Sequence, residues 1–203
     1  IHHRLVGSEM CIRDRLDIVV FGRAAAYRAA ATVEAGASHA PVSSASTEKA
    51  LDRLDRMRHA KGDSAAGEIR GAMQHAMQRH AAVFRSSQSL TDGVEKMDSI
   101  AARMDDIRVN DASLIWNTDL VEALELENLM SQALVTVRSA EQREESRGAH
   151  AHEDYPDRDD KEWMKHTVMW LDENNRSSLG YRPVHLNTLT NEVETIPPVA
   201  RVY

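Results

Sequence analysis

Apolar residues recur at helical spacing through the middle of the chain, in three successive stretches. Residues three and four positions apart lie on one face of a helix, so each stretch predicts an amphipathic helix with one buried side. A polar break at 61–63 separates the first stretch from the second, and Ser89 with Asp92 predicts a capping box in the third. The positions on these faces are Leu51, Leu54 and Met57; Ile69, Met73, Ala76, Met77, His80 and Phe84; and Leu90, Val94, Met97, Ala101 and Met104.

The longest predicted helix begins at residues 117–119, where Asn, Thr and Asp provide a start signal. Acidic residues fill its first turns, in keeping with the helix dipole. Arg143 and Arg147 lie near its end, and Gly148 is the predicted C-cap. The predicted buried face consists of Val121, Leu124, Leu126, Leu129, Met130, Ala133, Leu134 and Val137.

Helices with a single apolar face can bury a core only against one another. We therefore predict a mainly α fold, with a bundle of three or four antiparallel helices over residues 47–147. After Gly148 the chain becomes polar and acidic, and residues 148–203 are predicted as a loop, a hairpin and an extended tail. The hairpin strands are Thr167–Leu171 and Leu179–Val184, on either side of an Asn-Asn-Arg-Ser turn.

The chain before the bundle falls into two parts. Residues 16–46 begin with an Ala-rich stretch that predicts a buried helix ending near Gly36, with a strand over Ile18–Phe21 as the local alternative. A linker rich in Ser, Ala and Pro follows over 37–47. Residues 1–15 lack a clear period and the organisation of a signal peptide, and resemble translated sequencing-adapter read-through. We expect them to be a non-native leader.

Composition and charge exclude several classes of protein. The formal net charge is −7 and the pI is about 5.8, which argues against a nucleic-acid-binding module and a polybasic membrane anchor. The longest apolar run is interrupted by charged residues, so no membrane span is predicted. The single cysteine, Cys11, excludes an intrachain disulfide framework and a multi-cysteine metal site.

Candidate chemistry in the sequence is sparse. His150 and His152, with Glu153 and Asp154 beside them, could contribute to a metal site, but Pro156 places them in a loop and no third ligand has a characteristic spacing. The glycines show no G-x-G spacing, so no dinucleotide-binding turn is present. No G-x-S-x-G motif occurs either. From the residues alone we assign no catalytic, cofactor-binding or metal-binding residue.

The segment from Leu129 onward resembles the C-terminal region of the succinate dehydrogenase and fumarate reductase flavoprotein subunit. The core of the resemblance is Glu-Ser-Arg-Gly-Ala-His over 145–150, followed by Glu-Asp-Tyr-Pro over 153–156 and Asp-Arg-Asp-Asp over 157–160. The closing stretches 181–184 and 197–203 favour succinate dehydrogenase over L-aspartate oxidase, which shares the first pieces. Leu16–Ala31 resembles the end of the family's flavin domain. The signature residues are Ser146, Arg147, Gly148, His150, Asp154, Tyr155 and Pro156.

The resemblance implies that the chain is a C-terminal fragment of a subunit roughly three times as long. The implied fold is a three-helix, spectrin-like bundle followed by a small mixed α/β tail and preceded by the last helix of a missing flavin-binding domain. The parent enzyme would oxidise succinate to fumarate with hydride transfer to FAD. Its other partners would be the rest of the flavoprotein subunit and an iron–sulfur subunit that passes electrons to quinone.

The resemblance also bears on sites and location. The family's substrate-binding arginine aligns with Glu9, so no catalytic or flavin-binding residue carries over to this chain. Arg147 and His150 are expected to make hydrogen bonds between the bundle and the flavin domain, or else to cap a helix locally. A peripheral location is implied, on the cytoplasmic face of the bacterial inner membrane or the mitochondrial matrix side.

Two other interpretations remain open at this point. The chain could be an independently encoded helical interaction module that kept the family bundle, without catalysis of its own. It could instead be a divalent-metal protein that uses His150 and His152. The fragment interpretation predicts that this chain alone binds no FAD and is inactive, and the sequence leaves the physiological direction of the parent reaction open.

Overall fold

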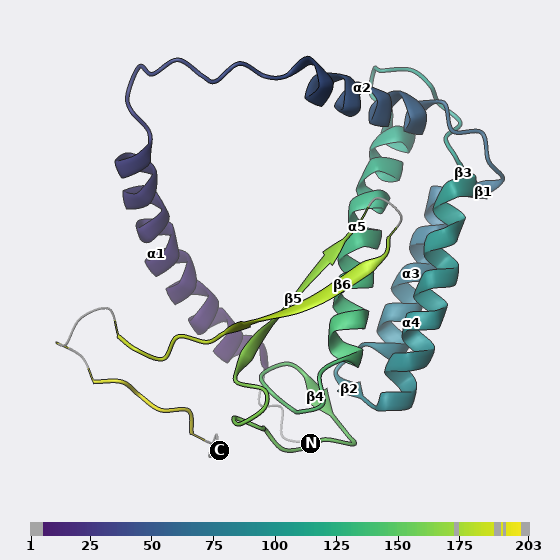
Figure 1. The fold of residues 1–203 in the computed structure, drawn as a ribbon. Helices are drawn as coiled ribbons and strands as arrows, with labels where there is room; N and C mark the ends of the chain where they lie inside the picture. Colours follow the sequence, from purple (N-terminus) through teal and green to yellow (C-terminus); the bar gives the residue numbers. More distant parts are fainter. Residues whose placement is uncertain (1–5, 173–174, 189–191, 193, 200–203) are drawn as a thin grey trace. The chain divides into compact units, whose positions relative to one another are not determined.

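The computed structural model describes residues 6–172, 175–188, 192 and 194–199, with side chains from residue 18 onward. The chain divides into two compact units, Ile1–Thr47 and Glu48–Tyr203. Figure 1 shows the order of the elements along the chain. The first unit holds one long helix, α1 (Val6–Thr32), and the start of α2 (Ser44–Arg58). All the other helices and strands belong to the second unit.

Helix α1 is longer than predicted, and it begins within the expected leader. Ile18–Phe21 is helical, so the strand alternative is wrong. The helix ends at Thr32, before the turn at Gly36, which has a φ of +81°. The predicted burial is not found within this chain, where residues 18–32 are exposed throughout.

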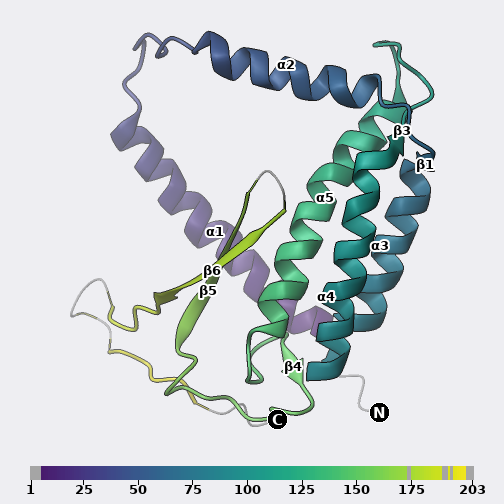
Figure 2. The same cartoon turned by 45° about the vertical axis from the view of Figure 1, so that its right-hand side comes forward.

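The core of the second unit lies among three helices that pack on one another: α3 (Ala66–His80), α4 (Ser87–Ala102) and α5 (Thr118–Glu141). Figure 2 shows the three helices side by side. The predicted three-helix bundle is therefore confirmed. The largest fully buried apolar side chains come from all three helices, and Met57 of α2 joins the same core. They are Ile69, Leu90, Met97, Leu126, Leu134 and Val137.

Several predicted helix boundaries and faces are wrong. Helix α4 begins three residues before the predicted box: its N-cap is Ser86, whose Oγ accepts a hydrogen bond from the Ser89 N–H (3.2 Å). Phe84 was predicted on the buried face of the second helix, but it lies beyond the end of α3 in a two-residue strand, where it is 73% exposed. On α5, Val121 and Leu129 face solvent, while Leu120 and Ala123 are in the core. The predicted start of α5 at residues 117–119 is confirmed: Asn117 is the N-cap, and its side chain accepts from the Leu120 N–H (2.8 Å).

The end of α5 also differs from the prediction. The helix stops at Glu141, so Gly148 is not its C-cap. Gly148 instead has a φ of +61° and lies in a tight turn, in which the Arg147 and His150 backbones donate hydrogen bonds to each other (2.9 and 3.0 Å). Glycine adopts this left-handed conformation without steric cost.

Short strands tie the connecting loops to the ends of the bundle. The strand β1 (Ser64–Ala65) pairs in parallel with β3 (Ile107–Arg108), which follows the 3₁₀ turn η1 (Arg103–Asp106). At the other end, β2 (Phe84–Arg85) pairs in parallel with β4 (Ala151–His152). The second pair places the loop after α5 against the turn between α3 and α4.

The predicted hairpin is confirmed, with strands β5 (Lys165–Leu171) and β6 (Ser177–Pro183) paired antiparallel. Strand β5 packs against α5. Arg138 of α5 fixes the turn of the hairpin, because it donates to the Asn175 carbonyl (2.7 Å) and forms an ion pair with Asp98 of α4 (2.6 Å). Residues 194–199 have no regular structure, and the rest of the predicted extended tail, 200–203, lies outside the described residues.

Gly93 sets how closely the helices of the bundle approach. A Cβ at this position would lie 2.7 Å from His80 Cβ of α3 and 3.3 Å from Val137 Cγ2 of α5. Replacing Gly93 with Ala should therefore lower the free energy of unfolding by about 1–2 kcal/mol, because overpacking exceeds the gain in helix propensity. Urea unfolding of Gly93→Ala measures this change.

Gly71→Ala is the matched control, because a Cβ at this position of α3 meets nothing within 4 Å. This variant should be more stable than the wild type by roughly 0.5–1 kcal/mol. Equal stability changes in the two variants would contradict the packing role of Gly93.

Candidate functional site

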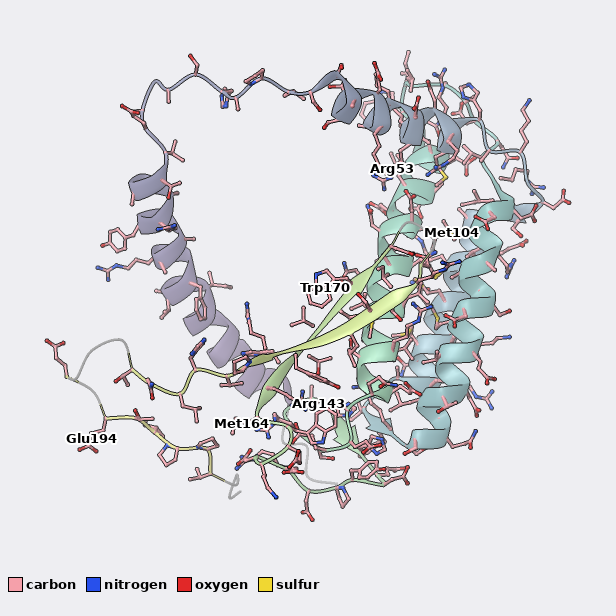
Figure 3. The ribbon with its side chains drawn as sticks, in the orientation of Figure 1. Arg53, Met104, Arg143, Met164, Trp170 and Glu194 are labelled. Atoms are coloured by element: carbon pink, nitrogen blue, oxygen red, sulfur yellow. The ribbon has the colours of Figure 1, made fainter. Side chains whose placement is uncertain are left out.

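The signature residues of the sequence lie in the loop that follows α5. The loop leaves the helix at Gln142, forms β4 against β2 and reaches β5 at Lys165. Figure 3 labels Arg143 and Met164 at this end of the bundle. The candidate site is therefore the junction of α5, the loop and the start of the hairpin, all within the second unit.

A buried carboxylate lies at the centre of the junction. Glu145 is 0% exposed. Its Oε1 accepts from the guanidinium groups of Arg143 and Arg147, the latter through Nε at 2.7 Å. Its Oε2 accepts from Arg147 Nη2 and from the Asp159 N–H, both at 2.9 Å. Both carboxylate oxygens are thus saturated by donors, most of them charged.

The electrostatics of the junction keep Glu145 ionised. Burial alone raises the pKa of this carboxyl, but the hydrogen bonds from Arg147, the Asp159 N–H and Arg143 outweigh it, so the pKa lies below its ordinary value. The pKa of Arg147 is raised, first by its hydrogen bond to Glu145 and against the opposing effect of its burial. The group is therefore a fully charged cluster with a defined geometry.

The two arginines also form bonds to the loop and to the start of the hairpin. Arg143 also donates to the carbonyls of Trp163 (2.7 Å) and Lys165 (3.1 Å), which positions the start of β5. Arg147 pairs with Asp160 at 2.7 Å. The pKa of the Asp160 carboxyl is lowered, first by its hydrogen bond from Arg147.

His150 is held in one tautomer. Arg85 Nη1 lies 2.8 Å from His150 Nδ1, and His150 Nε2 lies 3.0 Å from the Arg143 carbonyl. A guanidinium only donates and a carbonyl only accepts, so Nδ1 must be the acceptor and Nε2 must carry the proton. The imidazole is therefore neutral, and its pKa is lowered chiefly by burial.

The other signature residues fold the loop on itself and onto α4. Ser146 Oγ accepts from the His152 N–H and donates to the Tyr155 carbonyl, both at 2.8 Å. Asp154 Oδ2 accepts from the Ser87 N–H at 2.7 Å, at the first turn of α4, where a negative charge is favoured by the helix dipole. The Tyr155 ring packs edge-on against His152, and Pro156 follows it.

The sequence signature lies in the loop that forms the junction, but it leaves out the residue at the centre of the junction. The structure brings Ser146, Arg147 and His150 into one junction, with Asp154 and Tyr155 on its α4 side. Glu145, and the partner arginines Arg85 and Arg143, were not among the predicted site residues. Glu145 lay inside the quoted motif, and a carboxylate flanked by arginines at −2 and +2 was the available signal.

The histidines of the junction are the candidates for metal binding. Both ring nitrogens of His150 are occupied, so it is not available as a metal ligand beside His152, although their ring centroids are 5.7 Å apart. Among the described residues, no group of three or more His, Cys, Asp or Glu is arranged to hold a metal ion. No helix in the described part of the chain is long and apolar enough to cross a membrane.

Comparison with known proteins identifies the family. The sequence model for the fumarate reductase flavoprotein C-terminal region matches residues 70–203. The chain belongs to this family. It is 54% identical over 188 residues to the succinate dehydrogenase flavoprotein subunit of Rickettsia bellii. The aligned region covers 93% of this chain and 32% of that relative. The mitochondrial succinate dehydrogenase flavoprotein subunit of Oryza sativa is 49% identical over 188 residues, covering 93% and 30%.

The structural comparison agrees with the family assignment. A quinol fumarate reductase of E. coli superposes with a TM-score of 0.73 at 30% identity, covering 86% of this chain and 28% of the other. The chain thus spans about a third of the length of the curated relatives it matches. The likeness includes the bundle and the junction, since the family match begins in α3 and extends to the last residue.

The Glu145 cluster of this family member yields a stability prediction. Replacing Glu145 with Gln leaves the guanidinium groups of Arg143 and Arg147, which are only 14% and 27% exposed, without their shared anion. The free energy of unfolding should fall by about 3 kcal/mol. Urea unfolding measures this loss, with Glu144→Gln as the control, because Glu144 is exposed and should change stability by no more than about 0.5 kcal/mol. Comparable losses in the two variants would contradict the central role of Glu145.

His150 yields a pH prediction. The pKa of His150 is lowered from its ordinary value of 6.5, which is the value expected in the unfolded state. The folded state therefore binds the proton more weakly than the unfolded state does. The neutral His150 imidazole therefore makes its full contribution to the free energy of unfolding above pH 6.5. This contribution is lost as the pH falls below 6.5, at up to about 1.4 kcal/mol per pH unit. Between pH 7 and 5 the wild type should lose more stability than His150→Gln. The exposed-residue control His185→Gln should follow the wild type, and parallel curves for wild type and His150→Gln would refute the prediction.

Proposed function

We propose that the chain is the C-terminal part of a succinate dehydrogenase flavoprotein subunit, in which it serves as a structural and subunit-packing region. The observation that carries the proposal is the 54% identity over 188 residues, confined to about a third of the relative's length. The reaction of the whole subunit would be oxidation of succinate to fumarate with FAD as the hydride acceptor. The remaining two thirds would contain the catalytic groups.

The exposed apolar surface of α1 supports this proposal. Ile18, Val19 and Phe21 are 66–71% exposed, although such a cluster is normally buried. In the proposal, α1 is the last helix of the flavin domain, and its apolar side chains pack within that domain. That Arg147 and His150 make hydrogen bonds between the bundle and the flavin domain stays a prediction.

The described residues do not fit FAD. The sequence has no G-x-G turn, and the described sheets have two strands each, without the strand–turn–helix unit that binds a dinucleotide. The N-termini of α4 and α5 have side-chain acceptors of their own in Ser86, Asp154 and Asn117. FAD would therefore bind to the other part of the subunit, and we assign no step of the reaction to this chain.

The proposed partners and location follow from the same assignment. The chain would pack on the flavin domain of its own subunit, and the whole subunit would dock on an iron–sulfur subunit that passes electrons to quinone. The complex would lie peripherally at the bacterial inner membrane on its cytoplasmic face, or on the matrix side in a mitochondrion. Succinate and fumarate would bind in the whole subunit only.

A two-part experiment tests the proposal. The DNA upstream of the Leu16 codon should contain, in frame, a reading frame with a G-x-G-x-x-G motif. The subunit expressed from that frame should bind FAD and reduce an electron-accepting dye with succinate. The 203-residue chain, given FAD and succinate under the same conditions, should retain no flavin after gel filtration and reduce no dye.

Two results would overturn the proposal. Dye reduction by the 203-residue chain alone would place catalysis within it. An intact gene with its own start codon and no upstream flavin-binding frame would show an independently encoded helical module instead.

A further inference from the structure

A hollow of about 760 Å³ opens beside the C-terminal end of α5. It lies within the second unit, between the last turns of α5, the strand β2, the start of β5 and three residues that follow the hairpin, Val184, Leu186 and Pro198. Figure 3 labels Arg143 and Met164, which both line it. This volume is within the range of pockets that hold small organic molecules.

The charge of the hollow is opposite to that of the chain. Four cationic side chains line it, whereas the described lining residues include no Asp or Glu. The whole chain carries a net charge of −7, so this concentration of positive charge is not a reflection of composition. The four cations are Arg85, Arg143, Arg147 and Lys165.

Two of the four cations have no carboxylate partner in the part of the chain that the structure describes. Arg143 and Arg147 share Glu145, and Arg147 also pairs with Asp160. The guanidinium of Arg85 instead donates to the carbonyls of Ala81 and Ala82 and to the His150 ring. Its burial without an anion lowers its pKa.

Lys165 is the second cation without a carboxylate. Its ammonium lies over two aromatic rings, 4.7 Å from the centroid of Trp163 and 4.1 Å from that of Tyr181. Aromatic faces attract a cation but do not neutralise its charge as a carboxylate does. The Lys165 ammonium therefore has no anionic partner among the described residues, and Lys165 lines the hollow.

The remaining walls of the hollow are largely apolar. Seven of the twelve other lining residues are apolar, and the polar ones are Thr136, Ser139, His150, His166 and Thr167. The apolar ones are Val135, Ala140, Trp163, Met164, Val184, Leu186 and Pro198. A bare inorganic ion would leave these side chains facing water. A ligand that matches both parts of the lining has an anionic head and an apolar body.

We propose that this hollow is a binding site for a small organic anion, with a carboxylate or phosphate head group held by Lys165 and Arg85 and an apolar body against the α5 and tail side chains. Both head groups match guanidinium and ammonium donors. The proposal does not rest on the proposed function, because described residues of the second unit alone line the hollow.

Isothermal titration calorimetry on the 203-residue chain tests the site. Hexanoate and hexyl phosphate are the probes, at fixed ionic strength, and acetate is the comparison without an apolar body. We expect saturable binding of at least one hexyl probe at one site per chain. Hexanoate should bind at least about tenfold more tightly than acetate, because its additional methylene groups contact the apolar wall. The two head groups report which anion the donors prefer.

Variants at the rim distinguish this site from general attraction to the surface. Lys165→Met should weaken binding of the hexyl probe at least about tenfold, and Lys165→Arg should retain binding within threefold. Lys161→Met is the matched control, since Lys161 is exposed and does not line the hollow. Circular dichroism checks that each variant is folded. Absence of saturable binding by both hexyl probes, or equal weakening by Lys165→Met and Lys161→Met, would overturn the proposal.

Discussion

Burying one carboxylate between two guanidinium groups is the constraint that organises the region after the bundle. Arg143, Glu145 and Arg147 are spaced two residues apart, and on a helix such residues point in different directions. They converge only if the helix has already ended, and α5 does end at Glu141. The position of the helix end is thus tied to the cluster, because continuing α5 to Arg147 would leave Glu145 without its two cations.

Once the helix has ended, the same cluster fixes two features of the second unit, and His150 fixes a third. The Asp159 N–H on Glu145 returns the loop to the end of α5. The bonds from Arg143 to the Trp163 and Lys165 carbonyls set where the hairpin begins. The bond between His150 and Arg85 joins the loop to the turn between α3 and α4, beside the β2–β4 pair. Local packing and charge therefore determine the course of a loop that has little regular structure.

Periodicity predicted the elements of the bundle and the hairpin but not their ends or all of their faces. Helix α5 carries leucines on several sides, so its sequence does not distinguish Leu120 and Ala123, which are buried, from Val121 and Leu129, which are exposed. The buried side is decided by where α3 and α4 approach, and Gly93 permits that approach. The start of α4 also depends on Asp154, which accepts from Ser87 although the two residues are 67 positions apart in the sequence. The end of α5 had a local signal in the arginines on either side of Glu145, but helical periodicity alone does not detect it. The signature marked the right loop, but partners such as Arg85, 65 residues from His150, appear only in the fold.

The cluster that buries Glu145 also accounts for the charge of the neighbouring surface. One carboxylate held by two guanidinium groups leaves an excess of positive charge, and Asp160 is itself shared between Arg147 and Arg158. Arg85 adds a further cation because it is needed as a donor to His150 and to the two carbonyls at the end of α3. The arrangement that satisfies the buried groups of the junction therefore also leaves its open side cationic.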